Sequence, residues 1–318
     1  MPFSAQKLGS LVDPLFLVVA ALFNSLAPIL IRNTQDEENE YTYNRACFFF
    51  FAEVIKLAIA AVFCVLLKIN QDPEAEKMIV SSDLFKRYLG LGFCFFAQNN
   101  LSLFSLKHFS TSGYMLMMNS RIVLIAVLSI TVLGKRLNGV EWSAVLLITV
   151  GSVQHNVSRD SNANLRVPFE GLLVMLSCAG AAAIGNVYTQ LVMQKSDQPI
   201  MFQNLQLYLA GVGFNGINWL LTVLVWKTED EWLGKIDLSV VIAICFFAVY
   251  GLSISFVLKR FGALTRTLLG AVAIVLTGIW DYFIGTTMDI IDVCTYATII
   301  IAVYLYSEMG PKINPPKS

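Results

Sequence analysis

Charged residues inside apolar segments are the first candidates for chemistry in this sequence. Glu53 and Lys56 lie in one such segment, and Arg121 lies in another. Arg266 stands at the start of a third segment. A charge is costly in a hydrocarbon environment, so intramembrane charges usually face a polar cavity or a partner and mark a functional site.

Glu53 and Lys56 are three residues apart, which places them on one face of a helix. Two interpretations remain open for this pair. The two charges neutralise each other inside a helix bundle, or they face a water-filled cavity and separate when the cavity changes side.

Arg121 has no acidic neighbour within one helical turn, and Tyr114 lies two turns earlier on the same face. A guanidinium group suits bidentate recognition of phosphate, and a tyrosine adds a hydroxyl group or a ring. The alternative is an ion pair between Arg121 and an acid on another helix. Arg266 lies at a helix end, from which its side chain could also extend to the membrane interface.

Side-chain amides form a second group of polar residues in apolar segments. Asn100 ends the run Gln98-Asn99-Asn100, and Asn204 lies one turn before Tyr208. Amides within the membrane can hold helices together, or they can hydrogen-bond a nucleobase or ribose. The sequence leaves both interpretations open.

The composition is that of a polytopic membrane protein. Hydrophobic residues make up 56% of the chain, charged residues 14%, and the mean hydropathy is +0.66. A net charge of zero gives no indication of a nucleic-acid partner. The six cysteines all fall in apolar stretches and there are two histidines, so we expect neither a disulfide framework nor a histidine-rich metal site. No cofactor is expected.

The sequence predicts an all-α integral membrane protein with ten transmembrane helices. A hydrocarbon core of about 30 Å requires roughly 20 apolar residues per helix. No polar loop is long enough for a soluble domain, so residues 1–318 are expected to form a single transmembrane domain. The ten apolar segments are 14–32, 46–68, 88–106, 111–133, 139–157, 171–194, 203–226, 238–259, 266–285 and 289–306.

An even number of crossings places both termini on one side of the membrane. That side carries twelve lysines and arginines and the other carries seven, so the positive-inside rule predicts cytosolic termini. Loop 33–45 is then luminal and loop 69–83 is cytosolic. The sequon at Asn156 falls on the luminal side so close to a segment end that its glycosylation stays open.

The second half of the chain resembles the first. Residues 106–124 and 258–276, which are 152 positions apart, share seven of nineteen residues. Five segments separate the two copies, so one copy is inverted, and we expect repeats at about 14–157 and 171–306. The shift aligns Lys56 with Tyr208 and Tyr114 with Arg266. Inverted repeats are typical of alternating-access carriers, although matches between apolar helices also arise by coincidence.

The chain resembles the nucleotide-sugar transporters, in particular the UDP-galactose/CMP-sialic acid group. This resemblance implies a ten-helix drug/metabolite-transporter fold in the Golgi or ER membrane. It also implies exchange of a cytosolic nucleotide sugar for a luminal nucleoside monophosphate, with these molecules and the lipid bilayer as partners. The resembling segments are 53–57, 98–100, 114–121, 186–188, 204–209, 273–276 and 304–306.

The resemblance also implies roles for the candidate residues, all of them in substrate binding. Arg121 and Arg266 would bind phosphate, where lysines are usual in the family. Tyr114 would contact the phosphate and ribose. The pyrimidine base would be surrounded by Asn100, Asn204 and Tyr208, while Glu53 and Lys56 would face the sugar and the gate.

Three residues depart from the family's pattern around the base and the gate. Ala210 replaces a small hydroxyl residue, Gln190 replaces a glutamate, and Met118 replaces a tyrosine. The particular nucleotide sugar therefore stays open, whereas phosphate binding is less affected.

Two other functions remain as alternatives. One is an exporter of other metabolites or drugs on the same fold, which would not need two intramembrane arginines. The other is an integral-membrane transferase, which would need acidic or metal-binding groups near the interface. Asp289 and Asp292 are the only close acidic pair at a segment end and have no histidine partner, so we expect a transporter rather than an enzyme. The sequence does not decide the oligomeric state, and a homo-oligomer is compatible with it.

Overall fold

The computed structural model describes residues 5–34, 41–105, 111–159, 169–225, 232–283 and 289–309. Regular structure in these ranges is helical apart from an isolated bridge between Tyr43 and Gly234. A 3-10 helix, η1 (Pro73–Lys77), follows α2, and a π-helical turn, η2 (Leu305–Met309), follows α10. The α-helices are α1 (Ala5–Arg32), α2 (Arg45–Ile69), α3 (Ser82–Ser105), α4 (Thr111–Thr131), α5 (Gly139–Arg159), α6 (Phe169–Gln194), α7 (Ile200–Leu224), α8 (Leu238–Arg260), α9 (Ala263–Phe283) and α10 (Ile290–Tyr304).

Each of these α-helices overlaps one of the ten predicted segments, so the all-helical architecture is confirmed. Four helical stretches of the described chain are long and apolar enough to cross a membrane: 45–69, 200–224, 238–260 and 290–307. The number of crossings and the inverted repeat stay predictions. Part of the repeated sequence, residues 106–110, lies outside the described residues.

The chain divides into two compact units, each assembled from separate parts of the sequence. Unit 1 consists of Met1–Ser25, Ala97–Val187 and Phe261–Ser318. Unit 2 consists of Leu26–Phe96 and Tyr188–Arg260. Helices α1, α3 and α6 each contribute to both units.

Side chains before the helices satisfy amide groups that have no partner within the helix. Asn44 caps α2, since its Oδ1 accepts hydrogen bonds from the amides of Ala46 at 2.9 Å and Cys47 at 3.3 Å. Asp237 accepts from the amide of Val240 at 2.9 Å at the start of α8. A further hydrogen bond from the Ser239 hydroxyl holds the pKa of the Asp237 carboxyl below its usual value.

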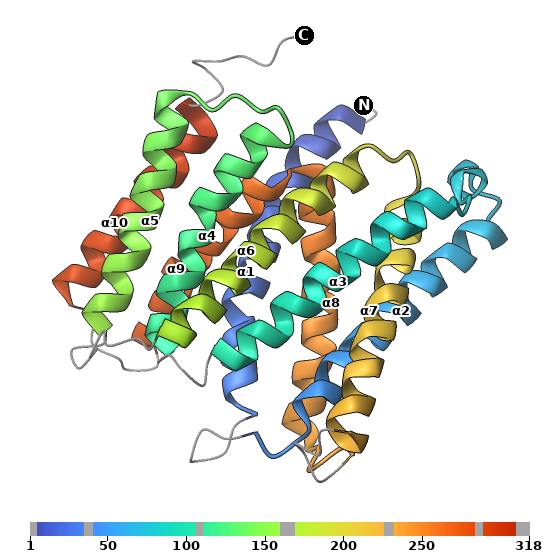
Figure 1. The fold of residues 1–318 in the computed structure, drawn as a ribbon. Helices are drawn as coiled ribbons and strands as arrows, with labels where there is room; N and C mark the ends of the chain where they lie inside the picture. The colour runs from blue at the N-terminus through green and yellow to red at the C-terminus, as the bar shows by residue number, and fades with distance from the viewer. Residues whose placement is uncertain are drawn as a thin grey trace. The chain divides into compact units, whose positions relative to one another are not determined.

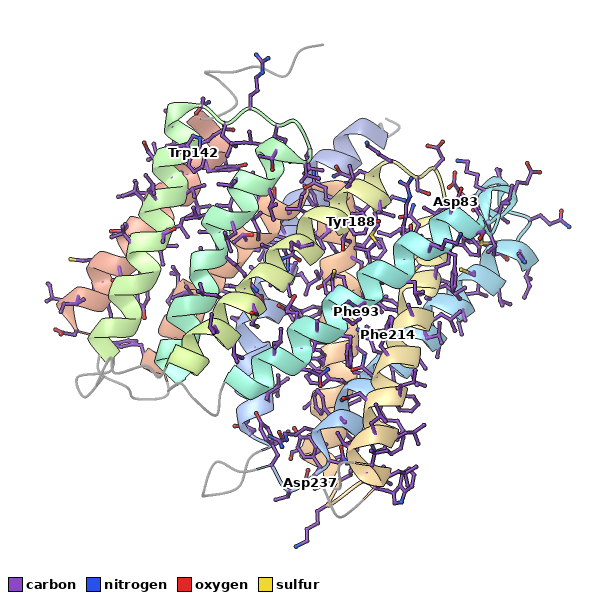
Figure 2. The ribbon with its side chains drawn as sticks, in the orientation of Figure 1. Asp83, Phe93, Trp142, Tyr188, Phe214 and Asp237 are labelled. Atoms are coloured by element: carbon purple, nitrogen blue, oxygen red, sulfur yellow. The ribbon has the colours of Figure 1, made fainter. Side chains whose placement is uncertain are left out.

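In unit 2, α2 lies along α7 and also packs on α8 (Figure 1). Small residues allow the close approach that apolar helices need in lipid. A Cβ atom added to Gly92 of α3 would lie 2.7 Å from the Cβ of Ala210 in α7. Further along the same two helices, the rings of Phe93 and Phe214 meet edge to face with centroids 5.6 Å apart (Figure 2).

In unit 1, α5 lies along α10, and α4 packs on α5 and α9 (Figure 1). Ile122 and Ile125 of α4 and Val145 of α5 are fully buried at these contacts. Gly151 permits the approach of α10, because an added Cβ would lie 3.2 Å from Cγ1 of Ile299. The core of this unit is therefore built from tightly fitting aliphatic side chains.

Two short extended segments join before α2 and α8 in unit 2. We call residues 42–44 and 233–235 the strand clasp. The amide of Asn44 donates to Leu233 O at 3.0 Å, and the amide of Lys235 donates to Thr42 O at 2.9 Å. Between them, Gly234 has φ +68°, and an added Cβ would lie 2.7 Å from Thr42 O. Only glycine fits this backbone conformation and spacing without strain.

We predict that Gly234→Ala destabilises the protein more than Gly134→Ala. Gly134 has nearly the same φ, +66°, but an added Cβ there meets no atom within 4 Å. Both substitutions carry the left-handed backbone cost of about 1–2 kcal/mol, and Gly234→Ala adds an overlap cost of roughly 1–3 kcal/mol. Thermal unfolding of the purified proteins in detergent measures the difference. Equal losses would contradict the close contact in the strand clasp.

Candidate functional site

Glu53 and Lys56 form a buried ion pair on α2. The Nζ of Lys56 donates a hydrogen bond to Oε1 of Glu53, and the two residues are 7% and 6% exposed. The helical spacing predicted this shared face. A buried ion pair gives little net stability because both charges lose their hydration, but removal of one partner leaves a costly unpaired charge.

The Lys56 ammonium group also lies over the ring of Tyr208, with Nζ 4.8 Å from the ring centroid. A cation in this position is attracted by the ring's electron-rich face. The hydroxyl of Tyr208 shares a hydrogen bond of 3.0 Å with Ser255 of α8. Side chains from α2, α7 and α8 therefore form one connected polar cluster within unit 2.

Two glycines bring helix backbones against this ion pair. A Cβ atom added to Gly211 of α7 would lie 2.7 Å from Oε2 of Glu53. A Cβ added to Gly251 of α8 would lie 3.0 Å from Cδ of Lys56. The sequence analysis singled out neither glycine nor Ser255. A glycine inside an apolar helix is a signal for close approach, but it does not identify the partner.

Asn204 lies one helical turn before Tyr208 and is fully buried. Neither its Oδ1 nor its Nδ2 has a hydrogen-bond partner among the residues that the structure describes. Buried amides are nearly always paired with protein, water or a ligand. The Asn204 side chain therefore has an unused acceptor oxygen and an unused NH2 group in the described structure.

The other four candidate residues belong to unit 1. Arg121 is half-buried in the middle of α4. Arg266 lies in the first turn of α9 and is 9% exposed. Asn100 is half-buried near the end of α3. Tyr114 lies on α4, but its side chain is outside the described residues.

The structure also shows the surroundings of two of the three residues that depart from the family's pattern. Ala210 is buried on α7 opposite Gly92. The side-chain Nε2 of Gln190 donates a hydrogen bond to Oε1 of Gln194 at 2.9 Å. The side chain of Met118 lies outside the described residues.

The acidic pair before α10 has a structural role. Asp289 is the N-cap residue and accepts from the amide of Ile290 at 2.7 Å, while Asp292 accepts from the amide of Asp289 at 3.3 Å. This reciprocal arrangement is a capping box. Helix capping explains the spacing of these two acids without any catalytic role.

We predict that Gly211→Ala disturbs the ion pair while Gly213→Ala does not. A Cβ at position 213 meets no atom within 4 Å, so this control adds only the better helix propensity of alanine, up to about 1 kcal/mol. Gly211→Ala displaces the Glu53 carboxylate and should cost roughly 1–3 kcal/mol. Thermal unfolding of both variants, each also made with Glu53→Ala, completes a double-mutant cycle. An unchanged Gly211→Ala effect in the Glu53→Ala protein would contradict the contact.

Comparison with known proteins identifies relatives over the whole chain. CMP-sialic acid transporter 1 of Oryza sativa subsp. indica is 30% identical over 210 residues, which cover 64% of this chain and 64% of that protein. The probable UDP-sugar transporter protein SLC35A4 of Xenopus tropicalis is 26% identical over 97% of this chain and 95% of its own length. The UDP-galactose transporter senju of Drosophila melanogaster is 23% identical over 94% of this chain and 87% of its own.

One solved crystal structure shares the fold. It covers 94% of this chain and 98% of its own, with a TM-score of 0.68 and 16% sequence identity. The family model described as nucleotide-sugar transporter matches residues 10–307. The chain therefore belongs to the nucleotide-sugar transporter family.

Proposed function

We propose that this protein exchanges a cytosolic pyrimidine nucleotide sugar, a UDP-sugar or CMP-sialic acid, for a luminal nucleoside monophosphate by alternating access. For a member of this family, the contact between Lys56 and Tyr208 is the observation that supports the proposal most directly. These residues are related by the shift of 152 positions, and they meet in space. Contact between equivalent positions is expected where two inverted repeats face each other across a pseudo-twofold axis.

The packing of the helices supports the same 5+5 arrangement. Helices α4 and α9 lie in sequence ranges related by the shift of 152 positions, and they pack on each other. The pairs α2 with α7 and α5 with α10 also pack together, and in each pair the second helix lies five further along the chain. Three of the five repeat-related helix pairs therefore pack together, one in unit 2 and two in unit 1.

The charged and amide residues suit a nucleotide sugar. Arg121 and Arg266 supply permanent positive charges for the phosphates, in planar groups that match phosphate geometry. The unpaired side-chain amide of Asn204 suits the edge of a pyrimidine. The family's pattern offers Asn100, Tyr114 and Tyr208 as further candidates.

The Glu53–Lys56 pair is placed to respond to the sugar and the gate. Its charges neutralise each other at low exposure, so neither is left unpaired while water is excluded. Entry of water or of an acidic or hydroxyl-rich sugar offers both groups alternative partners. The ion pair can then open without leaving a charge unpaired.

We further propose that both units act together as one transmembrane domain over residues 1–318, in the Golgi or ER membrane. All ten α-helices would cross the bilayer, with both termini cytosolic. Four helical stretches of the described chain are long and apolar enough to cross a membrane. The other helices would be accommodated by their packing against neighbouring helices, which covers their polar residues.

The exporter and transferase alternatives have weaker support. Two buried or half-buried arginines have no evident purpose for an uncharged solute. The acidic pair that a transferase would require is accounted for by the capping box before α10.

We predict that uptake of nucleotide sugar depends on nucleotide inside the vesicle and favours pyrimidines. Proteoliposomes preloaded with UMP, CMP or GMP, or left empty, test uptake of a panel of labelled nucleotide sugars. Pyrimidine monophosphates should stimulate uptake more than GMP, because the proposed amide and tyrosine contacts match the single ring of a pyrimidine and not the two fused rings of guanine. Full uptake into empty vesicles would contradict exchange, and equal stimulation by GMP would contradict base selectivity. A new glycosylated product would indicate an enzyme.

We predict that Arg121→Ala and Arg266→Ala each weaken binding of monophosphate and nucleotide sugar alike. Loss of a charge-assisted phosphate contact worth roughly 1.5–3 kcal/mol corresponds to about 10- to 100-fold in affinity. Lysine at either position should retain more affinity than alanine because the charge remains. Nucleotide-dependent thermal stabilisation of the purified variants measures this order.

Glu53→Gln is the contrasting variant. Monophosphate affinity should stay close to that of the unmodified protein, while exchange slows, because Glu53 is assigned to the sugar and the gate.

One outcome would contradict the prediction for the arginines. If nucleotide still stabilises Arg121→Ala fully, Arg121 is a structural residue and the phosphate site lies elsewhere.

A further inference from the structure

A set of amide hydrogen bonds closes the end of unit 2 where α2, α6 and α8 end. We call Gln198, Gln203, Gln206 and Lys259 the glutamine latch. Gln198 lies between α6 and α7 and is 8% exposed. Its Nε2 donates to Ile79 O, in the connection before α3, at 2.6 Å, and its Oε1 accepts from Nε2 of Gln206 at 2.9 Å.

The main-chain carbonyl of Gln198 accepts two further hydrogen bonds. It accepts from Nζ of Lys259, near the end of α8, at 2.9 Å. It also accepts from Nε2 of Gln203 at 2.8 Å. Through Gln198, therefore, the α2–α3 connection, α7 and α8 are held together.

The latch leaves two buried acceptors unsatisfied. The Oε1 atoms of Gln203 and Gln206 are buried without a hydrogen-bond partner in the described part of the chain. Exchanging the amide oxygen and nitrogen atoms would not help, because both Nε2 groups already donate to oxygens. Unpaired buried acceptors destabilise a closed arrangement relative to one in which water reaches them. The closed latch is therefore poised to open.

The strand clasp at the other end of unit 2 is built differently. Asp83, at the start of α3, and Asp237, before α8, mark these two ends in Figure 2. The strand clasp uses main-chain hydrogen bonds, and Gly234 packs against the Thr42 backbone. Opening the strand clasp would require new backbone conformations, whereas opening the latch requires only side-chain rotation.

We propose that Gln198 is a gate residue: the latch end of unit 2 opens in every transport cycle, while the strand clasp stays joined. The solute would pass where the side-chain bonds of Gln198 separate. This inference rests on the proposed transport function, but the opening itself is measurable without transport.

Hydrogen–deuterium exchange of the purified protein in nanodiscs tests the opening. Amides in residues 196–206 should be less protected than those of the strand clasp, by on the order of tenfold, because the latch opens by side-chain rotation whereas the strand clasp needs a change of backbone conformation. Gln198→Ala should accelerate exchange in both 78–86 and 196–206. The matched control is Gln194→Ala, because Gln194 bonds to the carbonyls of Leu258 and Lys259 but not to the α2–α3 connection. Equal protection at the two ends would overturn the proposal.

Cross-linking tests the gate in proteoliposomes, in a protein carrying Cys245→Ser and Cys294→Ser. A short bifunctional thiol reagent would join Ile79→Cys to Asp197→Cys, two exposed positions that leave Gln198 intact. Exchange should stop and return when the reagent is cleaved. The matched control joins Thr42→Cys to Lys235→Cys across the strand clasp and should keep exchanging.

Continued exchange with the latch joined, or loss of exchange with the strand clasp joined, would overturn the assignment of the gate. Absence of uptake by the unmodified protein would instead contradict the proposed function. The hydrogen-exchange comparison would then still decide whether the latch opens.

Discussion

The cost of keeping charged and amide groups away from water constrains this protein more than any other interaction. Glu53 and Lys56 tolerate burial because each neutralises the other and because two helix backbones approach them at glycines. Tyr208 adds the face of its ring, and its hydroxyl group is satisfied by Ser255. The packing of α2 on α7 and α8 thus depends on this polar cluster as much as on apolar fit.

The same constraint suggests how unit 2 can be both stable and mobile. Polar groups that are fully paired, such as those of the strand clasp, hold their surroundings in one arrangement. Polar groups that are only partly paired, such as Asn204, Gln203 and Gln206, favour the arrival of water or solute. A carrier needs both kinds, since it must keep its helices together while its binding groups exchange partners.

The proposed inverted repeat would give this arrangement a simple origin. If α2 and α7 descend from one ancestral segment, a cation at one position and a phenol at its equivalent meet near the symmetry axis. Under the proposed duplication, Lys56 and Tyr208 would be complementary partners that arose from one ancestral position. Arg121 and Arg266 lie on α4 and α9, which also pack on each other, but at positions that the shift of 152 does not align.

The sequence by itself determined the helical class, the approximate positions of the described α-helices, the shared helix face of Glu53 and Lys56, and the family. Hydropathy, i to i+3 spacing and ordered motifs are local properties, so they are readable along the chain. Only the tertiary structure decided that the Lys56 ammonium group lies over the Tyr208 ring and that α7 and α8 approach the ion pair closely at Gly211 and Gly251. The same holds for the hydrogen bonds through which Gln198 joins three elements. Such contacts link residues far apart in sequence, and in a chain this rich in apolar residues many helix pairings fit equally well until shape and hydrogen bonding select one.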